Sequence, residues 1–115
     1  MASTTGVLYR ATALKADASE VLYVRSLGFR PTKIVVHNRT NGVKVEWFAG
    51  LSEGTNIKTG ADGARSEVTA AVVPVNADAN GNAGISIPAG LVDVNDADGE
   101  NLAVEAFGGA PGLTP

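Results

Sequence analysis

The sequence predicts an all-β protein that forms a single small β-sandwich or barrel, with a jelly-roll arrangement as one option. The apolar residues occur in short runs, several with a period of two, and clusters of turn-forming residues separate these runs. No segment has the 3.6-residue periodicity of an amphipathic helix. The chain has 115 residues, among them 14 glycines and 5 prolines, and this length suits one domain with one core.

The first part of the chain predicts an arm followed by two strands. Residues 1–6 are small and polar, which indicates a flexible arm, and the β domain is expected over 7–107. Residues 7–14 contain β-branched and aromatic residues with partial alternation, and they predict the first strand. The short apolar run at 21–24 is partly β-branched and predicts a buried strand.

The clearest local signal is a hairpin over residues 32–49. An Asn41-Gly42 pair separates two apolar segments, and this pair tolerates the positive φ angles of a two-residue hairpin turn. The second arm alternates with a period of two, which predicts a core face and a polar face. The core face contains Val43, Val45 and Trp47, and the other face contains Lys44, Glu46 and Phe48.

The second half of the chain predicts a long loop followed by three strands. Residues 50–66 are rich in Gly, Ser, Thr, Asn and Asp, and they predict a long ordered loop. Strands are expected over 67–75, 85–88 and 102–107. Residues 108–115 contain three glycines and two prolines, and they indicate a loose tail or extended arm.

The composition excludes several classes of site. The chain has no cysteine, which excludes a disulfide scaffold, a thiolate zinc site and a cysteine nucleophile. A single histidine, His37, excludes a site with several histidine ligands. No apolar run approaches the length of a membrane span, and no basic segment precedes an apolar stretch at the N-terminus. We therefore expect a soluble protein without a signal peptide and without a membrane partner.

The charges are distributed unevenly along the chain. Residues 1–65 carry nine bases and five acids, whereas residues 66–115 carry seven acids and no base. Chance in a small domain is one explanation, and a surface with opposite potentials on two faces is the other. The bases are scattered and the net charge is −3, so a nucleic-acid partner is not expected.

An acidic turn near residue 96 is the best candidate for a metal site. Aligned on Gly99, the segment 94–105 resembles a twelve-residue calcium loop, but Val94 occupies the position where an aspartate ligand is needed. An EF-hand is therefore rejected. A looser calcium site could use Asp93, Asp96 and Asp98, although a solvated turn explains these residues better.

No cofactor and no enzymatic activity are predicted. A catalytic triad would have to use His37, which lies at the end of a predicted strand, and the sequence has no nucleophile elbow near it. No pair of carboxylates has a spacing that suggests acid–base catalysis. We therefore expect no catalytic residue. His37 is expected to lie at a strand end and to make a local hydrogen bond.

Residues 31–107 resemble small virion proteins of tailed bacteriophages, most closely capsid decoration, or cement, proteins. The resemblance is carried by PTKIVV at 31–36, GVKVEWFAGL at 42–51, GISI at 84–87 and NLAVEAF at 101–107. It implies a structural late protein on the phage head, made in the host cytoplasm and assembled as a homotrimer. Its partner would be the major capsid protein, whose subunits it bridges on the outer surface of the shell. A tail, baseplate or fibre module is an alternative, and so is a calcium-dependent carbohydrate-binding module.

Candidate contact residues follow from the predicted arm, the predicted loop and one exposed aromatic residue. Trp47 and Phe48 are adjacent in a strand, so one belongs to the core and the other either anchors an interface or enters a second core layer. The candidates for contact with capsid or with another subunit are Val7, Tyr9, Arg10, Phe48, Ile57, Lys58 and Arg65.

Overall fold

The computed structural model describes residues 8–24, 27, 29–51, 54–69, 72–75, 83–91 and 93–108, which form nine strands. The strands are β1 (Leu8–Lys15), β2 (Leu22–Val24), β3 (Lys33–Asn38), β4 (Val43–Phe48), β5 (Thr55–Thr59), β6 (Arg65–Thr69), β7 (Val73–Val75), β8 (Gly84–Ile87) and β9 (Asn101–Gly108). This described part of the chain contains no helix, and the predicted all-β class is confirmed. None of it forms a helix that could cross a membrane.

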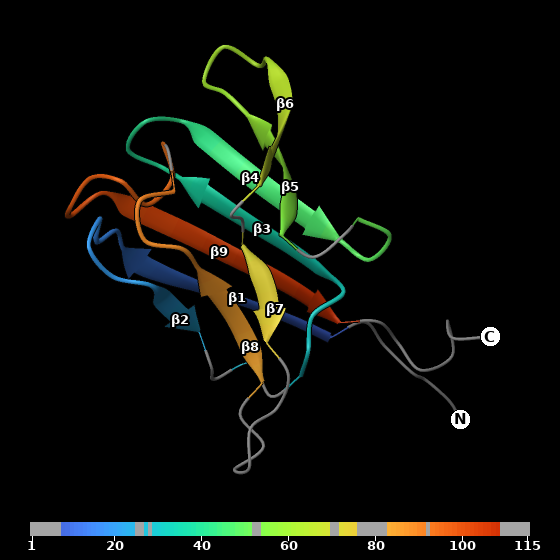
Figure 1. The fold of residues 1–115 in the computed structure, drawn as a ribbon. Coiled ribbons are helices and arrows are strands. Elements are labelled where there is room, and N and C mark those ends of the chain that lie inside the picture. The colour runs from blue at the N-terminus through green and yellow to red at the C-terminus, as the bar shows by residue number, and fades with distance from the viewer. Residues whose placement is uncertain are drawn as a thin grey trace, which may run out of the picture.

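The strands form two antiparallel sheets that pack face to face as a small β-sandwich (Figure 1). The larger sheet has six strands in the order β1-β9-β3-β4-β5-β6, and the smaller sheet has three in the order β2-β8-β7. The hairpin of β5 and β6 extends beyond β4 at one margin of the larger sheet (Figure 1). β1 forms the opposite margin.

The core lies between the two sheets and is built from alternate residues of the strands. β4 has the predicted pattern, because Val43, Val45 and Trp47 are buried and Phe48 is exposed. The core side chains of the larger sheet are Ile34, Val36, Val43, Val45, Trp47, Leu102, Val104 and Ala106. Those of the smaller sheet and its loops include Val24, Leu27, Val72, Ile85, Ile87, Leu91 and Val94. Full burial of one such large aliphatic side chain stabilises the fold by about 1.5–3 kcal/mol, so this set fixes which face of each strand turns inward.

The predicted hairpin over 32–49 is confirmed as β3 and β4, but its turn has four residues rather than two. The side chain of Asn38 explains the longer turn. Its Oδ1 accepts hydrogen bonds from the backbone N–H groups of Thr40 at 2.9 Å and of Asn41 at 3.2 Å. Gly42 closes the turn with a φ of 80°, a conformation that glycine adopts without a steric penalty.

The last strand of the chain, β9, lies inside the larger sheet between β1 and β3. Leu8 is the register partner of Gly108, so β1 begins where β9 ends. β1 and β3 carry bases from the first half of the sequence, whereas β9 carries the acid Glu105 from the second half. The strand order therefore places strands from the two halves of the sequence side by side. In this sheet, the uneven distribution of charge along the sequence does not produce one basic surface and one acidic surface.

The segment 50–66, predicted as a long loop, contains a strand and the start of another. β5 lies within it, β6 begins at its end, and residues 60–64 connect the two. The loop prediction is wrong here because β5 buries a polar residue, Asn56, and carries its one large apolar residue, Ile57, on the opposite side. This composition hides the period of two that identifies other strands of the chain.

Two further boundaries differ from the prediction. The single strand expected over 67–75 is two strands, β6 and β7, in different sheets. Pro74 lies in β7 at a margin of the smaller sheet, where the missing N–H of proline is tolerated. Gly108, assigned to the tail, ends β9. The predicted arm at 1–6 and the rest of the tail, 109–115, lie outside the described residues.

Three fully buried asparagines join distant segments of the sandwich. Asn56 acts as a substitute strand partner, because its Nδ2 donates to Val72 O at 3.1 Å and its Oδ1 accepts from Val72 N–H at 2.9 Å. Asn95 accepts a hydrogen bond from Asp17 N–H at 2.7 Å. Asn38 donates to the carbonyl oxygen of Val94 at 3.1 Å. These buried amides are satisfied by backbone groups, so they fix the loops around the smaller sheet.

Candidate functional site

The outer face of the larger sheet, which points away from the smaller sheet, is the candidate functional surface. The strand registers place its side chains in three rows that cross the strands. The first row contains Tyr9, Phe107, Lys33 and Phe48, the second contains Ala11, Glu105, Val35, Glu46, Ile57 and Glu67, and the third contains Ala13, Ala103, His37, Lys44, Thr59 and Arg65. Among the described residues there are only two sheets, so no third sheet covers this face.

The first row of the outer face is mainly aromatic. The ring centres of Tyr9 and Phe107 lie 5.0 Å apart, and Lys33 Nζ lies 5.5 Å from the centre of the Phe107 ring. Tyr9 is 50% exposed and Phe48 is 40% exposed. Aromatic side chains that become buried on association are the usual anchors of protein interfaces. This row is therefore the part of the face best suited to bury against a partner.

The other two rows carry both signs of charge together with apolar residues. The acids of the outer face are Glu46, Glu67 and Glu105, and its bases other than His37 are Lys33, Lys44 and Arg65. Half-buried Val35 and Ile57 separate the three glutamates along the second row. Lys44 Nζ lies 3.8 Å from Glu46 Oε1, a contact that contributes little at the surface. On this face the described residues form no continuous basic patch of the kind that binds nucleic acid.

One hydrogen bond links the first two rows. The Tyr9 hydroxyl donates to Glu105 Oε2 at 2.9 Å. This bond raises the pKa of the Tyr9 phenol above its ordinary value, with smaller contributions from desolvation and from the negative charge of Glu105. The bond also holds the exposed Tyr9 ring against β9, so the aromatic row is ordered before any partner binds.

The structure brings together some of the residues predicted to make contacts and separates others. Those on the outer face are Tyr9, Phe48, Ile57 and Arg65. Arg10 and Lys58 occupy alternate positions in β1 and β5, so they project from the opposite face of the same sheet. Val7 lies outside the described residues.

The predicted contact residues omit Phe107 and Lys33, which complete the aromatic row. A signal for Phe107 was present, because the alternation that places Leu102, Val104 and Ala106 on the core face turns Phe107 outward. No local signal places Lys33 beside it. That position depends on the pairing of β3 with β9, which are far apart in the sequence.

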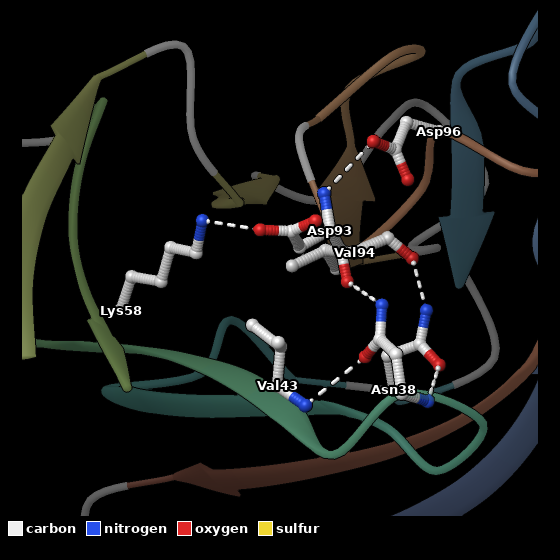
Figure 2. Close-up of polar contacts among 7 residues, drawn as sticks. Asn38, Val43, Lys58, Asp93, Val94 and Asp96 are labelled. Carbon is white, nitrogen blue, oxygen red and sulfur yellow. Dashed lines mark hydrogen bonds and ion pairs between the residues drawn. The ribbon is translucent and has the colours of Figure 1, made fainter. Parts of the chain in front are cut away.

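Lys58 joins the inner face of β5 to the turn that follows β8. Its Nζ lies 2.8 Å from Asp93 Oδ2, and its side chain is 19% exposed (Figure 2). Lys58 lines two neighbouring cavities, one of about 430 Å³ with Leu91 and Val68, and one of about 510 Å³ with Asp62. Because Asp93 already pairs with the ammonium group, neither cavity contains an unbalanced lysine charge.

The weak calcium candidates do not form a common site. Asp93 pairs with Lys58, and Asp96 accepts a hydrogen bond from the backbone N–H of Asp93 at 3.0 Å (Figure 2). Asp98 accepts a hydrogen bond from Ala18 N–H at 2.9 Å. The part of the chain that the structure describes contains no cluster of three or more metal-ligating side chains. The carboxylates of this turn serve as partners for protein groups.

His37 lies on the outer face in the third row. Its register partners are Lys44 in β4 and Ala103 in β9, and its side chain is exposed. Neither partner supplies a nucleophile or an orienting carboxylate, the groups that activate a catalytic histidine. His37 therefore belongs to the polar part of the outer face.

Fold and surface together define a small two-sheet β-sandwich whose larger sheet presents an aromatic row and balanced charges on an uncovered face. A comparison of the chain with protein-family models, with curated proteins and with solved structures finds no match. The outer face and the sequence are therefore the grounds for a functional proposal.

Proposed function

We propose that this chain is a structural protein of a tailed-bacteriophage virion, which binds the outer surface of the head and strengthens the shell. Its partner is the major capsid protein, whose adjacent subunits it bridges. The resemblance of residues 31–107 to capsid decoration proteins suggests the role. The observation on this molecule that supports the role is the uncovered outer face of the larger sheet, where Tyr9 and Phe48 are exposed in one row.

The outer face has the properties that a bridging surface needs. Its exposed aromatic rings supply apolar area to bury, and charges of both signs around them favour one orientation of docking. A protein that binds the assembled shell and not its separate subunits stabilises the assembly by mass action. Shell rupture would then have to break the contacts of each bound copy as well.

The position of the aromatic row also suits this role. The row lies at the end of the sheet where β1 begins and β9 ends, as the pairing of Leu8 with Gly108 shows. In the proposed role, the predicted arm at 1–6 and the predicted tail add contacts to neighbouring capsid subunits.

Co-sedimentation of the purified protein with empty phage capsids tests the proposal. We expect saturable binding in a fixed, high ratio to the major capsid protein. Phe48→Ser should weaken binding about tenfold or more, since a buried aromatic anchor contributes about 2 kcal/mol or more and about 1.4 kcal/mol corresponds to a factor of ten. The matched control is Tyr23→Ser, which removes an aromatic side chain that is 52% exposed on the smaller sheet. Absence of binding to any capsid, or equal losses in the two variants, would contradict the proposal.

A further inference from the structure

β1 is a long marginal strand that only one neighbour holds within the described part of the chain. It pairs with β9 over eight register positions and forms one margin of the larger sheet (Figure 1). Residues 9–13 are exposed throughout, including Arg10 and Thr12 on the inner face, so the smaller sheet does not cover this part of the strand, whereas Leu14 packs against the core. A strand of this kind offers unpaired backbone groups to another chain.

Hydrogen bonds determine which backbone groups of β1 point toward the free margin. Ala16 N–H donates to Glu100 O at 2.8 Å, whereas Thr32 N–H donates to Phe107 O at 2.7 Å. The backbone N–H and C=O groups of even-numbered residues in β9 therefore point toward β1, and those of odd-numbered residues point toward β3. Bonding alternates along an antiparallel ladder, so the even residues of β1 bond to β9. The residues whose N–H and C=O groups face the margin are Tyr9, Ala11, Ala13 and Lys15.

β1 lacks several of the features that usually prevent pairing between sheet margins. It has no proline, its register with β9 is continuous, and its two bases, Arg10 and Lys15, flank an uncharged centre, Ala11-Thr12-Ala13. The other margin of the larger sheet, β6, is shorter and carries Arg65 and Glu67. Short marginal strands with charges along their length resist pairing, whereas long ones with an uncharged centre favour it. The two margins of this sheet therefore differ, and β1 is the one suited to pairing.

We propose that β1 pairs with β1 of a second copy of this chain, antiparallel about a twofold axis at Thr12, so that the two larger sheets become one continuous sheet. This register joins residues that both face the margin, placing Ala11 opposite the partner's Ala13 and Tyr9 opposite the partner's Lys15. The contact is the same on both copies, as a twofold interface requires. The proposal depends on the margin of β1 and not on what the outer face binds.

Charge complementarity argues for a second copy as the occupant. In this register, Lys15 of one copy lies beside the partner's Tyr9, whose hydroxyl is already bonded to Glu105. Each lysine, whose Nζ donates to Asn101 Oδ1 of its own copy, therefore also gains a nearby carboxylate across the interface. Arg10 projects from the other face, opposite the apolar Leu14 of the second copy, so bases of the two strands do not face one another. The pairing yields a dimer, unlike the trimer that the resemblance implies.

Sedimentation velocity of the full chain over a range of concentrations tests the pairing. Ala11→Pro removes a backbone N–H that faces the margin. It removes no N–H that bonds to β9, so the hydrogen bonds between β1 and β9 remain. We expect a reversible wild-type dimer whose dissociation constant rises about tenfold or more in this variant, because two symmetry-related hydrogen bonds are lost. A wild-type chain that stays monomeric, or that forms a trimer, would overturn the proposal.

A charge reversal tests the register without using proline. Lys15→Glu should weaken the dimer, because it places a carboxylate beside Glu105 of the second copy, and adding Glu105→Lys should restore most of the affinity. The matched control is Asp62→Lys, which reverses an exposed charge in the turn between β5 and β6, away from β1, and should leave association unchanged. Failure of the second substitution to restore affinity, or equal weakening by Asp62→Lys, would contradict the register.

Amide hydrogen exchange gives a position-specific readout. At low concentration the N–H groups of Ala11 and Ala13 should exchange rapidly, whereas that of Thr12 should be protected by its bond to β9. At high concentration Ala11 and Ala13 should become protected as well. Rapid exchange at both alanines in an associated sample would show that a different surface mediates association, and would overturn the proposal.

Discussion

Lys58 and Asp93 connect the larger sheet to the turn after β8 through an ion pair in which Nζ and Oδ2 lie 2.8 Å apart. Asp93 has a φ of 64°, in the left-handed region that side chains with a Cβ rarely adopt. Further bonds hold it there, because Asp93 N–H donates to Asp96 Oδ2 at 3.0 Å (Figure 2). In addition, Asn41 Nδ2 donates to Asp93 O at 2.7 Å. The ion pair and the turn geometry therefore depend on the same residue.

Substitutions at Asp93 should distinguish the contribution of the ion pair to the free energy of unfolding from the cost of the backbone strain. Asp93→Ala should lower the free energy of unfolding by about 1–2 kcal/mol, since a partly exposed ion pair contributes up to about 1 kcal/mol and left-handed alanine costs about 1 kcal/mol. Asp93→Gly loses the ion pair but relieves the strain, so it should cost less. Urea denaturation measures both values. A glycine variant less stable than the alanine variant would show that strain is not part of the cost.

Asn56→Ala should be among the most destabilising polar substitutions in the chain. It leaves the N–H and C=O groups of Val72 without the partners that they have in the sandwich. Each unsatisfied buried group costs about 1–3 kcal/mol, so a loss of about 2–4 kcal/mol is expected in chemical denaturation. Asn101→Ala is a suitable control because it removes an exposed hydrogen bond, the one that Lys15 Nζ donates to Asn101 Oδ1, and it should cost about 0.5 kcal/mol or less. Similar losses in both variants would mean that water replaces the contacts of Asn56.

The hydrogen bond from Tyr9 to Glu105 predicts a pH dependence. The bond favours the neutral phenol and raises the pKa of Tyr9 in the folded state. Its contribution to stability is therefore complete below the ordinary tyrosine pKa of about 10 and is lost as the pH rises through the higher folded value. Phenolate absorbance in a Tyr23→Phe background reports Tyr9 alone, since the chain has two tyrosines. Adding Glu105→Gln should lower the measured pKa, and an unchanged value would contradict the assigned cause.

Trp47→Phe should change stability by no more than about 1 kcal/mol, in contrast to Trp47→Ala, which should cost about 3–5 kcal/mol. Trp47 is 4% exposed, and its buried Nε1 has no hydrogen-bond partner among the residues that the structure describes. Phenylalanine removes this unpaired donor, which offsets part of the packing lost with the smaller ring. Thermal and urea unfolding of both variants test this expectation. A loss above about 2 kcal/mol for phenylalanine would indicate that the indole N–H is paired in solution.

The sequence predicts those elements whose core face follows a period of two. β4 and β9 are such strands, because Val45 and Val104 recur with apolar neighbours at alternate positions. β5 does not follow this rule, because its buried position is occupied by a polar residue, Asn56. The side-chain amide of Asn56 is hydrogen-bonded to the backbone of Val72, which the sequence does not reveal. The candidate site was harder to predict. Tyr9 and Phe48 share a row only because β9 and β3 lie between β1 and β4, and no local pattern specifies that order.

The position of β9 has a consequence for biosynthesis. Lys15 and Asn101, which bond to each other across β1 and β9, are 86 residues apart in the chain. The consecutive strands β3, β4, β5 and β6 can pair with one another as soon as they leave the ribosome, because their contacts are short in sequence. β1 must wait for β9, so one side of β3 stays open until residues 101–108 have been translated. During that interval the nascent chain exposes the unpaired side of β3, which makes the interval the point of greatest risk for mispairing between crowded copies.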